Sequence, residues 1–155
     1  MILLGISENS DKNIVFNKTL SIYRELFKMP IKVAELSHFE NGKPYVKGQE
    51  DVKLSVSHSG KYLVIALSNN EVGVDIQEEK PVDYQKISAR YGFSANDLTE
   101  FYKKFTLAEA TVKLTSTDLP TSLKQADTLS GTTYHFLKGY TLSVVGEGSC
   151  YFVII

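Results

Sequence analysis

Cysteine and tryptophan are nearly missing from this chain, which has one cysteine, Cys150, and no tryptophan. A single thiol excludes an internal disulfide and a zinc site built from several cysteines. Basic residues are not in surplus, because the net charge is −1, and this argues against a nucleic-acid-binding surface. No apolar segment approaches the roughly 20 residues of a membrane span. Met1–Ile6 is apolar but is followed at once by polar residues, unlike a signal peptide, so we expect a cytoplasmic protein with no membrane partner.

What the chain does contain is the composition of a globular protein with a sizeable core: 155 residues, 43% of them hydrophobic and 23% charged. Apolar spacing predicts an α+β fold. The predicted strands cover residues 2–6, 52–56, 62–67, 72–76, 132–137, 140–145 and 150–155, with an extended segment at 31–39. The predicted helices cover about 11–28, 83–91, 94–103 and 105–114, and residues 120–131 are expected to be irregular. This order suggests two α+β halves, about 1–70 and 71–155, that meet near Asp75.

Two apolar runs, 62–67 and 72–76, are separated by an asparagine pair and therefore predict a β-hairpin. Polar residues occupy the two outer ends of this predicted hairpin. Ser57 and His58 precede the first run, and Asp75 and Gln77 lie at the end of the second, where they share one face of the strand. An antiparallel hairpin would bring these four side chains together. Aspartate is a poor strand residue, so its position suggests a function.

Two acids and a lysine are the strongest candidates for chemistry. Asp75 could bind a hard cation such as Mg²⁺, which takes one or two protein carboxylates together with phosphate oxygens. The alternative is an aspartate at a strand edge that forms a salt bridge. Glu109 and Lys113 are four residues apart on a predicted helix and share a face. The alternative for them is an ordinary helix-stabilising pair, with Thr106 and Glu109 also matching a capping box.

Three further residues could contact an anion or a base, although each has an ordinary structural explanation. His58 lies between two serines and could donate to a phosphate, but a histidine in such a position is commonly a surface residue. Lys43-Pro44 follows a glycine and reads as a turn. His38 and His135 have no acidic or cysteine neighbours at ligand spacing, so we expect structural roles for both.

The order of these motifs is more informative than any one of them. Together they resemble the 4′-phosphopantetheinyl transferases of the Sfp (surfactin-synthetase-activating) type. The resemblance covers about half of the chain, residues 41–113, and a late segment, 139–144, is similar as well. The motifs are Gly-Lys-Pro at 42–44, Ser-His-Ser-Gly at 57–60, Val-Gly-Val-Asp-Ile at 72–76 and Phe-Thr-x-x-Glu-Ala-x-x-Lys at 105–113.

The resemblance implies a pseudo-twofold α+β fold that binds coenzyme A in a cleft between its halves. It implies Mg²⁺-dependent transfer of phosphopantetheine from coenzyme A to a serine of an acyl or peptidyl carrier protein. The protein would be a monomer, since the pseudo-twofold already supplies an internal dimer. Glu109, Lys113 and His58 would be the catalytic residues, and Asp75, Glu109 and Gln77 the metal ligands. The residues that bind coenzyme A would be Lys43, Pro44, Ser57, His58 and Lys113.

The sequence departs from the family pattern at a few positions. Ala108 stands where relatives commonly have a lysine, which we expect would place a further cation near the phosphates. Gln77 stands where relatives commonly have a second acid. The usual basic cluster for the 3′-phosphate is missing, and the nearby substitutes are Lys12, Lys18 and Arg24. These departures leave two alternatives to an active enzyme. One is a family member that binds coenzyme A or a carrier protein without turnover, and the other is a structural domain that binds no ligand.

Overall fold

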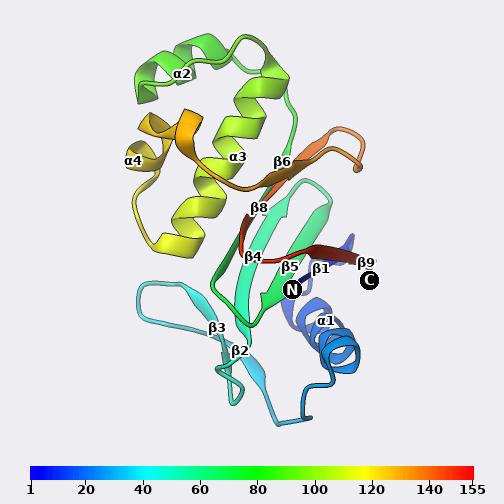
Figure 1. The fold of residues 1–155 in the computed structure, drawn as a ribbon. Coiled ribbons are helices and arrows are strands. Elements are labelled where there is room, and N and C mark those ends of the chain that lie inside the picture. The colour runs from blue at the N-terminus through cyan, green and yellow to red at the C-terminus, as the bar shows by residue number, and fades with distance from the viewer.

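The computed structural model describes residues 1–155 and contains helices and strands in mixed order, which confirms the predicted α+β class (Figure 1). The strands are β1 (Ile2–Ser7), β2 (Glu35–His38), β3 (Pro44–Lys47), β4 (Lys53–Ser59), β5 (Tyr62–Ser68), β6 (Val72–Glu78), β7 (Thr132–Tyr134), β8 (Tyr140–Gly146) and β9 (Cys150–Ile154). The helices are α1 (Lys12–Phe27), α2 (Tyr84–Tyr91), α3 (Leu98–Thr115) and α4 (Leu119–Lys124), followed by a 3₁₀ turn at Ala126–Thr128. None of the helices combines the length and the apolar character needed to cross a bilayer.

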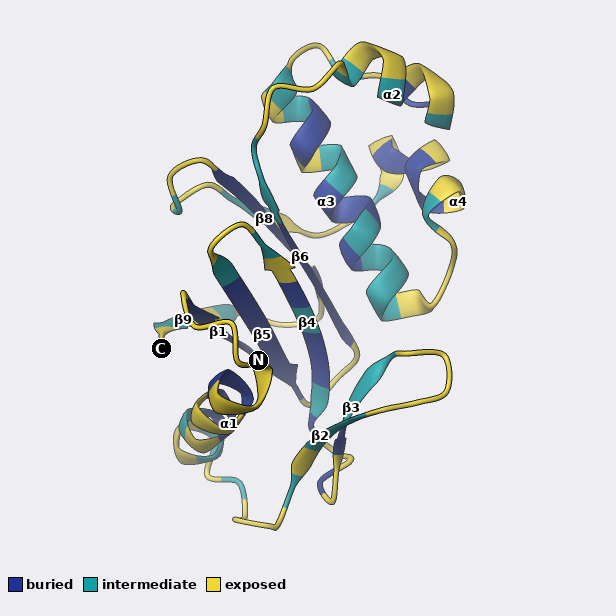
Figure 2. Ribbon diagram, turned by 180° about the vertical axis from the view of Figure 1, so that it is seen from behind, coloured by how far each residue is buried: buried dark blue, intermediate teal, exposed yellow.

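Two sheets pack face to face, and each carries helices on its outer face (Figures 1 and 2). The first has the strand order β4-β5-β1-β9 and the second β6-β8-β7. Alternation along the strands explains the layers, since one face of β1 and β5 meets β6 and β8 while the other face meets α1. The outer face of the second sheet is covered by α3, with α2 and α4 beyond it (Figure 1).

The C-terminal strand β9 lies in the sheet of the N-terminal half, where it pairs in parallel with β1. The two ends of the chain therefore lie on the same sheet, at opposite ends of this pair of neighbouring strands (Figure 1). The β2–β3 ribbon forms no backbone ladder with either larger sheet and projects from them as a separate hairpin (Figure 2).

The predicted hairpin of residues 62–67 with 72–76 is wrong. Both edges of β5 are already occupied, because β4 pairs with one edge and β1 with the other. β6 therefore leaves this sheet and pairs with β8. The true hairpin is β4–β5, and it turns at Gly60, whose φ of +54° lies in the left-handed region that glycine tolerates. A Cβ at Gly60 would also overlap the hydroxyl of Tyr140.

The predicted helices at 94–103 and 105–114 are in fact one helix, α3, because nothing between them breaks a helix. Asp97 caps it by accepting a hydrogen bond from the Glu100 amide at 2.7 Å. Thr106 lies inside this helix, and its hydroxyl donates to the Tyr102 carbonyl at 2.7 Å, so it forms no capping box. Residues 120–131 are less irregular than expected, because Asp118 caps α4 by accepting from the Thr121 amide.

Candidate active site

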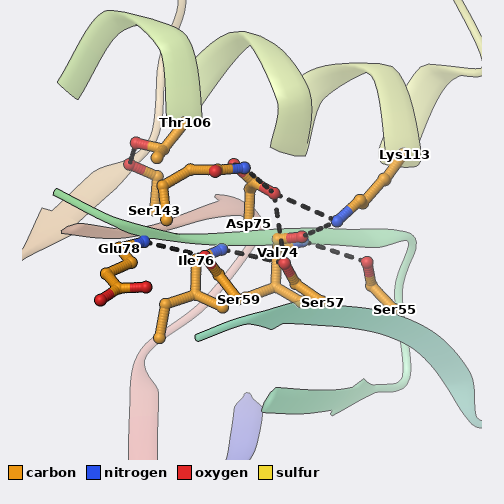
Figure 3. Close-up of polar contacts among 11 residues, drawn as sticks. Ser55, Ser57, Ser59, Val74, Asp75, Ile76, Glu78, Thr106, Lys113 and Ser143 are labelled. Carbon is orange, nitrogen blue, oxygen red and sulfur yellow. Dashed lines mark hydrogen bonds and ion pairs between the residues drawn. The ribbon is translucent and has the colours of Figure 1, made fainter. Parts of the chain in front are cut away.

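Three serines of β4 join the two sheets along the line where β4 lies beside β6 (Figure 3). We call Ser55, Ser57 and Ser59 the serine seam. Their hydroxyl oxygens accept hydrogen bonds from alternate backbone amides of β6, at residues 74, 76 and 78, over 2.9–3.1 Å. Serine side chains thus take the place of the carbonyls of a neighbouring strand and satisfy buried N–H groups. The seam holds β4 and β6 in register and brings Ser57, from the Ser-His-Ser-Gly motif, beside Asp75.

Asp75 is the central group of the site and is only 3% exposed. Three side chains donate to its carboxylate: Ser57 at 3.2 Å, Gln77 at 3.1 Å and Lys113 at 3.3 Å. The Lys113 ammonium also donates to the carbonyl of Val74 at 2.9 Å, which fixes it against β6. Burial raises the pKa of the Asp75 carboxyl, and Lys113 offsets part of that rise.

Glu109 is half-buried one turn before Lys113 on α3, and it does not take part in this hydrogen-bond network. Burial raises the pKa of the Glu109 carboxyl, and the negative charge of Asp75 raises it further, while Lys113 opposes both. The two acids therefore lie close enough to repel one another, with one lysine to balance two carboxylates. A divalent cation would relieve this repulsion.

Gly73 explains how α3 comes so close to β6. An ideal Cβ at this position would overlap the carbonyl oxygen of Ala110 and would lie 2.8 Å from its carbonyl carbon. The glycine of the Val-Gly-Val-Asp-Ile motif is therefore required by packing, because only a residue without a side chain lets the helix lie against the strand. This contact is what allows Lys113, one turn further along α3, to reach Asp75.

A cleft of about 840 Å³ opens beside this network. Its walls come from the β2–β3 hairpin, the start of α1, β4 and the end of α3. The lining includes most of the residues singled out by the sequence: Lys43, Pro44, Ser57, His58, Asp75 and Lys113. Motifs that are up to 70 residues apart in the chain, from Lys43 to Lys113, thus meet at one cavity. A cavity of this size suits a ligand larger than an amino acid.

The close approach of Ser57 to Asp75 was predicted for the wrong reason. It results from the serine seam between β4 and β6, not from the expected hairpin. Gln77 lies beside Asp75 as expected from strand alternation, but it presents its amide nitrogen to the carboxylate. Glu109 and Gln77 are not among the residues that line the cleft.

Sequence reasoning assigned a structural role to His38, whereas the hairpin places it in the lining of the cleft. Of the three cations named as substitutes for the basic cluster, Lys12 lines the cleft and Lys18 is exposed on α1. Arg24 is hydrogen-bonded to Gln49 and does not line the cleft. No local pattern could have revealed these placements, because each depends on where the hairpin packs.

The expectation for position 108 is not supported by the geometry. Ala108 is fully buried, and it packs with Phe93, Phe101 and Leu123 on the side of α3 that faces α2 and α4. A lysine at this position would begin in an apolar cluster and not in the cleft.

Comparison with known proteins agrees with the motifs, although no family model matches the chain. It is 31% identical over 106 residues to the 4′-phosphopantetheinyl transferase psf-1 of Bacillus pumilus, which covers 61% of this chain and 45% of that protein. It is 27% identical over 92 residues to the 4′-phosphopantetheinyl transferase Sfp of Bacillus subtilis (strain 168), covering 59% and 39%. The matched segments span less than half of the length of these relatives. Over about half of its own length, the chain is thus similar to 4′-phosphopantetheinyl transferases of the Sfp type.

Proposed function

We propose that this protein is a 4′-phosphopantetheinyl transferase that moves phosphopantetheine from coenzyme A to a serine hydroxyl of an acyl or peptidyl carrier protein. The observation that carries the proposal is the meeting of Asp75 and Lys113 with Ser57, His58 and Lys43 at one cleft. The named function of the relatives supports it. In this reaction the carrier serine attacks a phosphorus of the pyrophosphate, and adenosine 3′,5′-bisphosphate leaves.

The residues present fit a magnesium ion. Asp75 and Glu109 offer two carboxylates whose mutual repulsion only Lys113 offsets. The structure contains no cluster of three or more acidic, histidine or cysteine ligands, so a Mg²⁺ ion here would need phosphate oxygens and water to complete its shell. Gln77 could join as a neutral ligand by turning its amide oxygen toward the site. When bound, Mg²⁺ would neutralise charge on the pyrophosphate and polarise it.

The side chains of the cleft have complementary tasks in binding and transfer. His58 is exposed at the rim and can donate to a phosphate oxygen, while Ser57 holds the strand that carries Asp75. Lys43 and Pro44 border the far wall, where we place the adenine. Lys113 lies where its ammonium can stabilise negative charge on the transferred phosphate. Glu109 does not line the cleft, so it would accept the proton of the carrier serine through a water molecule.

We also propose that the two halves, about 1–70 and 71–155, are related by a pseudo-twofold axis with the ligand between them, in a cytoplasmic monomer. The cleft supports this arrangement because Ser57 comes from the first half and Asp75 from the second. Incubation of an apo carrier protein with this protein, coenzyme A and Mg²⁺, followed by mass spectrometry, tests the function. A mass gain of one phosphopantetheine is expected, and an unchanged carrier would refute the proposal.

The second candidate is a family member that binds coenzyme A or a carrier without transfer. The observation in its favour is Gln77, which leaves the metal site with one carboxylate fewer than the family pattern and donates a hydrogen bond to Asp75. Binding of coenzyme A in calorimetry together with an unmodified carrier would favour this candidate over the enzyme.

A further inference from the structure

The β2–β3 hairpin supplies one wall of the cleft and is joined to the rest of the protein through side chains alone, with Val46 fully buried in the core beneath α1. It carries His38, Lys43 and Pro44 of the lining, yet it forms no backbone ladder outside itself. Near its tip, Lys43 forms a salt bridge of 3.2 Å with Glu71, whose side chain is half-exposed. An exposed pair of this kind contributes little. The position of the hairpin therefore depends on the packing of Val46 and on the polar contacts at its base.

At that base lies a compact polar cluster built around Arg24 and Gln49. The guanidinium donates twice to the Gln49 amide oxygen, at 3.0 and 2.6 Å, and once to the carbonyl of Lys32 at 2.6 Å. The Gln49 amide nitrogen donates to the carbonyl of Pro30 at 3.2 Å. Gln49 is only 1% exposed, and such a buried amide is tolerated because both of its ends are hydrogen-bonded.

These contacts join the two segments that bracket the hairpin. Pro30 and Lys32 belong to the segment that enters it, and Gln49 belongs to the loop that leaves it. Gly48 brings the two backbones together, since it has a φ of +91° and a Cβ there would overlap the carbonyl oxygen of Val33. Arg24, in the last turn of α1, ties both segments to the helix.

We propose that Arg24 and Gln49 are positioning residues that hold the hairpin wall of the cleft and thereby set its affinity for coenzyme A. The second part of this inference rests on the proposed function. Neither side chain lines the cleft, so each acts through the hairpin. The planar guanidinium of Arg24 donates at once to the Gln49 side chain and to the Lys32 carbonyl. A lysine ammonium is a point charge and cannot reproduce this geometry. If the hairpin samples open positions, the apparent affinity equals the affinity of the closed form multiplied by the fraction of molecules that are closed.

The first measurement needs no ligand. Spin labels at Asn41→Cys and Thr117→Cys, in a Cys150→Ser background, report the width of the cleft by double electron–electron resonance. We expect a narrow distance distribution in the parent and a broad one after Arg24→Lys or Gln49→Leu. Gln49→Glu keeps an acceptor for the guanidinium but loses the donor to the Pro30 carbonyl, so its distribution should be of intermediate width. The matched control, Arg90→Lys on α2, should equal the parent. Unchanged distributions in both disruptive variants, with the native circular dichroism spectrum retained, would overturn the proposal.

The second measurement is made on unlabelled protein. Arg24→Lys and Gln49→Leu should raise the Kd and KM for coenzyme A by roughly fivefold or more, with kcat at saturation changed less than about twofold. A wider cleft with unchanged affinity would overturn the link to binding. Failure of the parent itself to bind coenzyme A would refute the proposed function, while the distance measurement would still decide whether Arg24 and Gln49 hold the hairpin.

Discussion

Replacement of Gly73 by alanine should separate the helix α3 from the strand β6 and disturb the site without changing any of its polar side chains. The new Cβ would lie 2.8 Å from the carbonyl carbon of Ala110 and 3.2 Å from the Cβ of Leu114, inside the 3.4–4 Å of ordinary contact. The nearest obstacle is backbone, which cannot rotate away. We therefore expect the substitution to cost about 3 kcal/mol of unfolding free energy, at the upper end of the range for overpacked cores.

Urea denaturation followed by circular dichroism measures this cost, with Gly139→Ala as the control. Gly139 has a φ of +80° and no neighbour within 4 Å of its ideal Cβ, so its substitution tests backbone conformation alone and should cost about 1 kcal/mol. Because α3 must shift, Gly73→Ala should also lower carrier modification more than Gly139→Ala does. A Gly73→Ala protein as stable as the parent would refute the reasoning that close helix packing fixes Lys113 beside Asp75.

Three more predictions concern the candidate site and the orientation of α3. Lys113→Met and His58→Ala should each weaken coenzyme A binding in calorimetry. The affinity of the parent should also fall as the salt concentration rises, because screening weakens contacts to phosphate. Affinities of both variants equal to that of the parent, at low and at high salt, would remove both residues from the binding site. Gln77→Glu should lower the Mg²⁺ concentration needed for half-maximal turnover by supplying a second charge beside Asp75, with an unchanged requirement as the contrary result. Ala108→Lys should lower the unfolding free energy by about 3 kcal/mol or more, since it buries a charged chain in an apolar cluster; a rise in turnover at unchanged stability would contradict the orientation of α3.

Local signals predicted the local elements well. Asp11 caps α1 by accepting from the amides of residues 13 and 14, as expected for an aspartate that precedes a helical apolar pattern. The apolar run at residues 2–6 is a buried strand, and Asp83 caps α2. In each case the residues that determine the helix or strand lie within a few positions of it in the chain, so the element can be predicted from the sequence.

The partner of each strand could not be predicted in the same way. A hairpin of residues 62–67 with 72–76 satisfies every local rule. In the structure, however, β1 pairs with that edge of β5, and this places the apolar strand β1 between β5 and β9. The serine seam was equally hidden. Ser55, Ser57 and Ser59 look like a loop cluster, and only the approach of β6 shows that their hydroxyls replace strand carbonyls.

The candidate site shows the same division. Asp75 could be singled out because a carboxylate is out of place in an apolar strand, and Lys113 because its spacing from Glu109 puts both on one face of a helix. His38 could not, because its role depends on the packing of the hairpin base around Gln49. The orientation of Ala108 depends on how α3 is rotated against the sheet, which helical periodicity alone does not fix.

Asp75 and Glu109 form the proposed site of phosphopantetheine transfer. The most direct measurement is the mass of an apo carrier protein after incubation with coenzyme A, Mg²⁺ and either the parent, Asp75→Ala or Glu109→Ala, each checked for an intact fold by circular dichroism. We expect a gain of one phosphopantetheine with the parent and no gain with either variant. Near-normal modification by both folded variants would contradict it.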